Sequence, residues 1–140
     1  MVCRPNSHEK DWTKIMKHFF AQQSDITFAL LFGSRANGKI HPQSDWDFAV
    51  WFKNYSVNER FIQKEQLRQQ LAQRLKTNSH EIDVIDLQSA SLSLMSSVVA
   101  DGIILKGDDL LELMLFYKRV WSLEEDFYWR LQHENSTLSS

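Results

Sequence analysis

The sequence predicts an α/β domain, because short apolar runs of strand length alternate with longer segments of helical periodicity. The expected strands are residues 26–32, 48–52, 80–87 and 103–105. The expected helices are residues 8–22, 58–76, 89–100 and 108–131. With 140 residues and 43% hydrophobic content, the chain suits one core, so we expect a single domain over residues 1–140.

The N-terminal helix is predicted from apolar side chains at helical spacing, with Ser7 as a possible cap. These side chains are Trp12, Ile15, Met16, Phe19 and Phe20. The first strand follows Asp25 and is apolar except for Thr27. The segment from Arg35 to Ser44 contains the turn-forming pair Asn37-Gly38 and is expected to be a loop.

The helix over residues 58–76 is predicted from an apolar stripe surrounded by polar residues. The stripe consists of Phe61, Leu67, Leu71 and Leu75. Its basic residues are spread around the helix, so we expect a solvated face for them, with one of them reaching a bound phosphate as the alternative. They are Arg60, Lys64, Arg68 and Arg74.

The last helix opens at Asp108-Asp109, where acids favour the helix dipole, and is expected to end near Leu131. Residues 133–140 are expected to form a disordered tail. Apolar side chains ring more of this helix than one core stripe needs, which predicts a partner surface beside the core contact. Its aromatic residues are Phe116, Tyr117, Trp121, Phe127, Tyr128 and Trp129.

Charge and composition limit the possible partners. The formal net charge of −2 does not suggest a broad basic surface for a long nucleic acid. Cys3 is the only cysteine, so no disulfide framework or cysteine-rich zinc site is expected. The polar N-terminus and the lack of any apolar run of about 18 residues predict a cytoplasmic protein without a membrane span.

Two acids at the start of the second strand are the strongest indication of chemistry. Asp45 and Asp47 lie one residue apart, so in a strand they point the same way, with Cα atoms about 7 Å apart. Mg²⁺ prefers oxygen ligands and is typically held by one or two carboxylates together with substrate phosphates. Two such ions can hold both the attacking and the leaving oxygen of a phosphoryl displacement.

Gly33 and Ser34 directly follow the first strand and suit the other half of such a site. Glycine allows a ligand to approach the backbone closely, and successive N–H groups in a turn can bind an anion. Ser34 adds a hydroxyl donor, and Arg35 adds a cation for phosphate oxygens. Either pair alone is more often an ordinary turn or strand start, so the ordered combination carries the prediction.

The third strand carries acids on both of its faces. Alternation places Glu81 and Asp83 on one face and Asp86 on the other. Alternation alone leaves open which of these acids has a chemical role, and Asp86 near the strand end could instead cap or turn the chain.

The combination of Gly33-Ser34, a ten-residue spacer and Asp45-Trp46-Asp47 resembles the signature of the DNA polymerase β-like nucleotidyltransferase superfamily. The runs from Gly33 to Gly38 and from Ser44 to Val50 resemble its small stand-alone members, the minimal nucleotidyltransferases, which commonly carry a second arginine where this chain has Asn37. The resemblance extends over about residues 26–106.

This resemblance implies a small mixed sheet covered by helices on one face, with the site on the other. It implies attack of a hydroxyl on the α-phosphorus of a nucleoside triphosphate, with release of pyrophosphate. Gly33, Ser34, Arg35 and Ser44 would bind the nucleotide. Asp45, Asp47 and Asp83 would be the catalytic acids and would ligate Mg²⁺, with two ions expected.

The resemblance is closest to antitoxins that pair with a HEPN-domain toxin, a small helical ribonuclease. It implies transfer of AMP from ATP to a toxin tyrosine within a hetero-oligomer. From the aromatic last helix, we expect Trp121, Phe127 or Trp129 to anchor part of that complex. Two alternatives stay open: an antitoxin that acts only by binding, and a small-molecule nucleotidyltransferase with a separate substrate-binding subunit.

Overall fold

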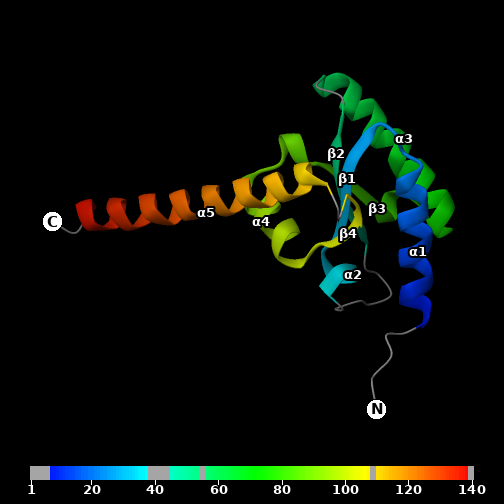
Figure 1. The fold of residues 1–140 in the computed structure, drawn as a ribbon, viewed down its shortest axis with the longest axis horizontal. Helices are drawn as coiled ribbons and strands as arrows, with labels where there is room; N and C mark the ends of the chain where they lie inside the picture. The colour runs from blue at the N-terminus through cyan, green and yellow to red at the C-terminus, as the bar shows by residue number, and fades with distance from the viewer. Residues whose placement is uncertain (1–6, 38–44, 54–55, 108–109, 139–140) are drawn as a thin grey trace, which may run out of the picture.

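Four strands form one mixed sheet at the centre of the fold (Figure 1). The computed structural model describes residues 7–37, 45–53, 56–107 and 110–138. The strands are β1 (Ile26–Phe32), β2 (Trp46–Phe52), β3 (Ile82–Asp86) and β4 (Ile103–Lys106), in the order β3-β2-β1-β4. β1 pairs with β2 and β4 in antiparallel fashion, whereas β2 and β3 are parallel. The α/β class and all four expected strands are therefore confirmed.

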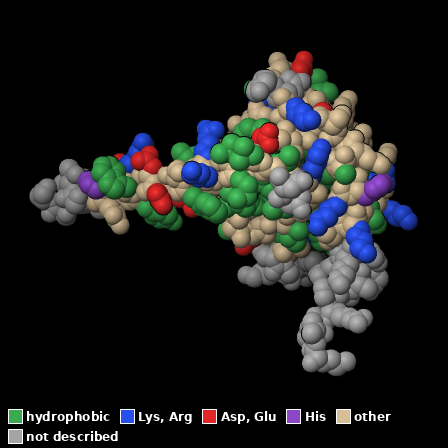
Figure 2. Space-filling view, viewed as in Figure 1, with side chains coloured by type: hydrophobic (Ala, Val, Ile, Leu, Met, Phe, Trp, Pro, Cys, Tyr) green, Lys and Arg blue, Asp and Glu red, His purple; other side chains and the backbone are tan. Residues whose placement is uncertain are grey.

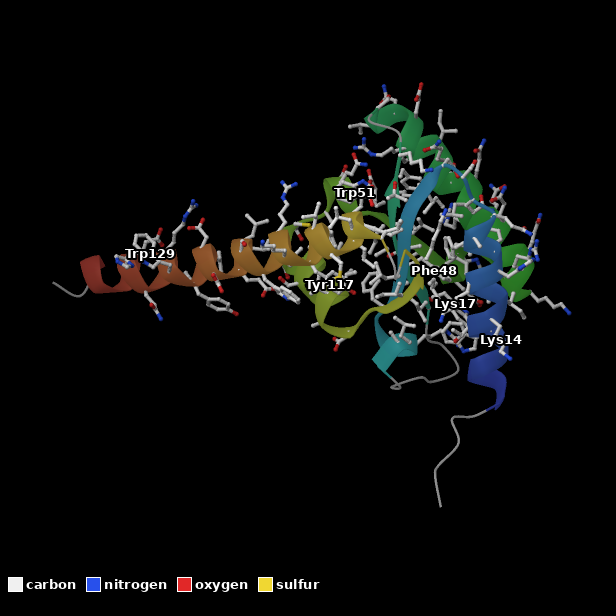
Figure 3. All side chains as sticks on the ribbon, in the orientation of Figure 1. Lys14, Lys17, Phe48, Trp51, Tyr117 and Trp129 are labelled. Carbon is white, nitrogen blue, oxygen red and sulfur yellow. The ribbon has the colours of Figure 1, made fainter. Side chains whose placement is uncertain are left out.

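Helices cover both faces of this sheet, rather than the one face that we expected. α1 (Ser7–Ala21) and α3 (Val57–Leu75) pack on one face, where Figure 3 labels Phe48 between the sheet and α1. α4 (Leu92–Asp101) and α5 (Leu111–Leu138) pack on the other face. The strands are apolar on both sides, so each face needs its own cover. Short helical turns complete the connections: α2 (Ser34–Asn37), η1 (Ser79–Glu81) and η2 (Leu87–Ser89).

The buried side of α3 differs from the predicted stripe. Leu67 and Leu71 are buried as expected, but Phe61 is 60% exposed and Arg60 only 4% exposed. The prediction of a solvated Arg60 was therefore wrong. The buried stripe runs from Arg60 to Leu67 and Leu71, because the guanidinium has an ionic partner beneath the helix.

The last helix is longer than predicted and extends beyond the body of the protein (Figure 1). α5 continues to Leu138, so residues 133–138 are helical rather than a disordered tail. Its predicted start at Asp108-Asp109 lies outside the described residues. Among the helices that the structure describes, none is long and apolar enough to cross a membrane.

Candidate active site

Asp47 and Asp83 are neighbours in the sheet, on its α4 and α5 side. They occupy matching positions of the parallel strands β2 and β3. Neighbouring strands lie about 4.8 Å apart, and residues in register point to the same face. Asp45 comes two residues before Asp47 and is exposed. The predicted alternation, with Asp83 and Asp86 on opposite faces of this strand, is confirmed, and Asp83 is the one on the face of Asp47.

The three carboxylates influence one another through their charges. Burial raises the pKa of Asp47, and the negative charges of Asp83 and then Asp45 raise that pKa further. An acid whose ionised form is disfavoured by its surroundings gains from a nearby cation. The electrostatics of these side chains therefore favour a positively charged ligand.

The turn after β1 brings Gly33 against the same carboxylate. Phe32, the last residue of β1, pairs with Asp47, and Gly33 follows with φ of +79°. A β-carbon at Gly33 would collide with Oδ2 of Asp47. Glycine is thus required twice, by the left-handed backbone and by the close approach of Asp47. The Gly33-Ser34 turn and the acids are side by side, as the order of the motifs predicted.

Arg35 packs on the other side of the sheet. Its guanidinium lies 4.1 Å from the ring centre of Trp46, whose side chain contributes to the core cluster beneath α1 and α3. Burial lowers the pKa of Arg35, while the charges of Glu81 and Asp45 oppose that shift. The charge of Asp45 thus acts on the Arg35 guanidinium, although that guanidinium stacks on the indole of Trp46. Ser34 begins α2, and Ser44 lies outside the described residues.

Asp86 is held away from this site by an ion pair. Its Oδ2 accepts a 2.7 Å hydrogen bond from Nε of Arg60 on α3, and its Oδ1 accepts one from the backbone N–H of Gln88. Sequence reasoning missed Arg60. The available signal was its spacing of seven and eleven residues before Leu67 and Leu71, which places it on their side of the helix.

The donor chemistry fits a divalent metal ion with oxygen ligands. In the described ranges, no three His, Cys, Asp or Glu side chains form a preassembled cage for an ion. Mg²⁺ commonly keeps several waters and takes the rest of its coordination from one or two carboxylates and substrate phosphates. The open arrangement of Asp45, Asp47 and Asp83 suits that mode of binding.

A comparison with protein-family models identifies the fold behind this geometry. Residues 14–110 match the model described as "Polymerase beta, Nucleotidyltransferase". The chain belongs to this nucleotidyltransferase family.

Two curated relatives of this nucleotidyltransferase are similar to it in sequence. It is 36% identical over 100 residues, 68% of the chain, to "Protein adenylyltransferase MntA" of Aphanizomenon flos-aquae. It is 30% identical over 113 residues, 81% of the chain, to "Protein adenylyltransferase MntA" of Shewanella oneidensis. In both comparisons the match spans 66% of the relative's length.

Solved structures resemble the nucleotidyltransferase over most of its length. A chain from "Crystal structure of the toxin-antitoxin with AMP-PNP" has a TM-score of 0.67 and 27% identity. That match covers 94% of this chain and 98% of the other. A chain from a structure of "the toxin-antitoxin MntA-HepT" has a TM-score of 0.60 and 25% identity, covering 94% and 97%.

Proposed function

We propose that this nucleotidyltransferase transfers AMP from ATP to a tyrosine of a helical HEPN-domain toxin and thereby neutralises the toxin. The observation that carries this proposal is the placement of Asp47 beside Asp83 and against Gly33, at one end of the sheet. Phosphoryl transfer to a hydroxyl depends mainly on positioning the reactants and balancing charge, which acids on two neighbouring strands and a tight glycine turn are placed to do.

The proposed roles follow from position. The backbone of Gly33 and Ser34 holds the triphosphate, with Ser44 and Arg35 as further candidates for nucleotide contacts. Arg35 stacks on Trp46 by the face of its guanidinium, which leaves the N–H groups at the edge of that group as candidate donors to a phosphate. Asp83 is exposed on the edge strand and accepts the proton of the tyrosine hydroxyl. The phenolic oxygen bonds to the α-phosphorus of ATP, the bond from that phosphorus to the bridging oxygen breaks, and pyrophosphate leaves.

Asp45, Asp47 and Asp83 are the proposed ligands for Mg²⁺, with two ions expected. When bound, the metal neutralises phosphate charge and favours the ionised tyrosine. Of the three ligands, Asp47 gains most from a bound cation, because it is half-buried and the negative charges of both other acids act on it.

Names of relatives support the choice of nucleotide and acceptor. Both curated relatives are named protein adenylyltransferases, and a structure similar over nearly the whole chain is a toxin–antitoxin pair with the ATP analogue AMP-PNP. Transfer to a toxin tyrosine also agrees with the family resemblance of the Gly33 to Val50 segment. The added AMP blocks RNA at the toxin by its charge and its volume.

Intact-mass measurement of the toxin after incubation with ATP, Mg²⁺ and this protein tests the proposal. We expect a mass increase of one or more AMP groups with the wild type. We expect none with the Asp45→Asn, Asp47→Asn double variant, which keeps side-chain size but loses the charges that bind metal.

Parallel assays of toxin ribonuclease activity distinguish the alternatives. An unshifted mass together with continued inhibition by the double variant would establish an antitoxin that acts by binding alone. An unshifted and uninhibited toxin, with AMP transferred to a small acceptor, would favour the small-molecule enzyme.

A further inference from the structure

One apolar stripe of α5 continues past the edge of the body. In the first part of the helix, the stripe consists of Leu113, Phe116 and Val120, all buried against the sheet. At 100° per residue, Glu124, Phe127 and Leu131 continue the same stripe within about 40° of Leu113. Yet Phe127 is 50% exposed and Leu131 39% exposed. Figure 2 shows hydrophobic side chains along α5 from the body into its projecting part.

A groove lies beneath this projecting stripe, between α4 and α5. Its volume is about 630 Å³, and its lining includes Leu92, Ser96 and Ala100 of α4 and Glu124, Phe127 and Tyr128 of α5. Small side chains on α4 leave the groove open, while the aromatic rings of α5 form its wall. Such a groove between two helices matches the side chains of a third helix packed as ridges into grooves.

The charge in the groove indicates the chemistry of its occupant. Glu124 is partly buried between the apolar positions of the stripe. The nearest arginines of α5 in sequence, Arg119 and Arg130, lie about 140° and 120° around the helix from Glu124, and Arg130 pairs with Asp126. Two copies of this chain meeting through the same groove would bring acid toward acid. A different partner with a basic side chain suits the groove better.

We propose that the groove between α4 and α5 is the docking site for a helix of the toxin. That helix presents apolar side chains on either side of a lysine or arginine, which pairs with Glu124. The inference rests on the proposed function for the identity of the partner. α4 and α5 cover the face of the sheet that also carries Asp47 and Asp83, so a docked toxin lies on the side of the acids.

The test compares two aromatic residues on opposite sides of one helix. Phe127 lines the groove. Trp129, which the sequence also offered as an anchor, is about 200° away around α5 and stacks on His133, so of these two the groove selects Phe127. Figure 3 labels Trp129 on the projecting part of α5. Both are at least half exposed, at 50% and 57%, so neither substitution should change folding. The variants are Phe127→Asp, Glu124→Arg and, as the matched control, Trp129→Asp.

Binding of each full-length variant to the purified toxin is measured by calorimetry, with melting temperature as the folding control. We expect Phe127→Asp to weaken binding at least about 30-fold, as for a central interface residue, and Glu124→Arg about 10-fold or more. Trp129→Asp should stay within about 2-fold of the wild type, as residues outside an interface do.

Unchanged binding by Phe127→Asp, equal losses for Phe127→Asp and Trp129→Asp, or no binding by the wild type would overturn the docking site. A wild-type dimer in sedimentation that Phe127→Asp dissociates would also overturn it, because a second copy would then fill the groove. AMP transfer to the toxin is measured separately. If groove variants lose binding while even the wild type transfers no AMP, docking stands and the proposed reaction fails.

Discussion

Asp83 and Asp86 lie three residues apart on β3, yet their surroundings are opposite in character. Asp83 points to the face of Asp47, is exposed, and adds its charge to a group of acids. Asp86 points to the face of α3, where its side chain is 13% exposed and pairs with the almost fully buried Arg60. One strand thus carries an acid for which we propose a chemical role and an acid that pairs with a buried arginine.

The difference lies in which charge each carboxylate meets. Acids that face other acids destabilise the protein until a cation arrives, whereas an acid beneath a buried guanidinium neutralises a charge that would otherwise be costly. Replacing Asp83 should therefore impair activity and spare folding, and replacing Asp86 should do the reverse. The predictions below test this contrast.

Replacement of Asp83 should have the largest effect. We expect Asp83→Ala to lower AMP transfer at least about 1000-fold. The variant lacks the proposed base for the tyrosine hydroxyl and one proposed ligand for Mg²⁺. Binding of the triphosphate should be largely retained, since Gly33 and Ser34 remain. Single-turnover transfer and nucleotide binding are measured on the same preparation, and transfer within about 10-fold of wild type would remove Asp83 from the reaction.

Replacement of Asp86 should mainly reduce stability. We expect Asp86→Ala to lower the free energy of unfolding by about 3 kcal/mol, because Arg60 keeps its charge in a buried place without its main partner. Denaturant unfolding measures this loss, and transfer per folded molecule should stay within about 3-fold of wild type.

The double variant Arg60→Met, Asp86→Leu serves as the control for this loss. It removes both charges and should recover much of the stability, since apolar replacement of a buried pair is often neutral. Loss of activity without loss of stability in Asp86→Ala would assign the chemical role to Asp86 instead.

The sequence was sufficient to predict the arrangement around Asp83. The four strands, their alternation and the order of Gly33, Asp47 and Asp83 all depend on local patterns, and a two-residue period assigns side chains to faces. The phase of α3 was not predictable in this way. Arg60 is buried because it pairs with Asp86, 26 residues later in the chain. A prediction from local apolar spacing instead assigns the buried position to an apolar neighbour such as Phe61.

The cover of the sheet and the length of α5 also differed from the prediction, each for its own reason. Apolar residues on both sides of β2 required two layers of helices, but the resemblance suggested an open face. α5 continues beyond the body, where no core contact stabilises it. The residues after Leu131 are mostly polar, so their sequence gave no indication that the helix persists to Leu138.

Neutralising Asp47 should have the smallest effect on stability among these replacements, and it tests the contrast from the side of the acids. Burial and the charges of Asp83 and Asp45 raise the pKa of Asp47 above its ordinary value of 3.8. Between the ordinary and the raised pKa, the folded protein holds a proton that the unfolded chain releases, so stability falls as pH rises through this window. Asp47→Asn cannot ionise and should lack this loss.

In metal-free buffer, we expect Asp47→Asn to melt about 1–2 °C above wild type at neutral pH, a small gain because the half-exposed carboxylate is screened by water. The difference should vanish near pH 3, where the wild-type acid is protonated. Added Mg²⁺ should raise the melting temperature of the wild type more than that of the variant. A variant that melts lower than wild type without metal would mean that Asp47, like Asp86, stabilises the fold through a partner, and the contrast between the two faces of β3 would not extend to β2.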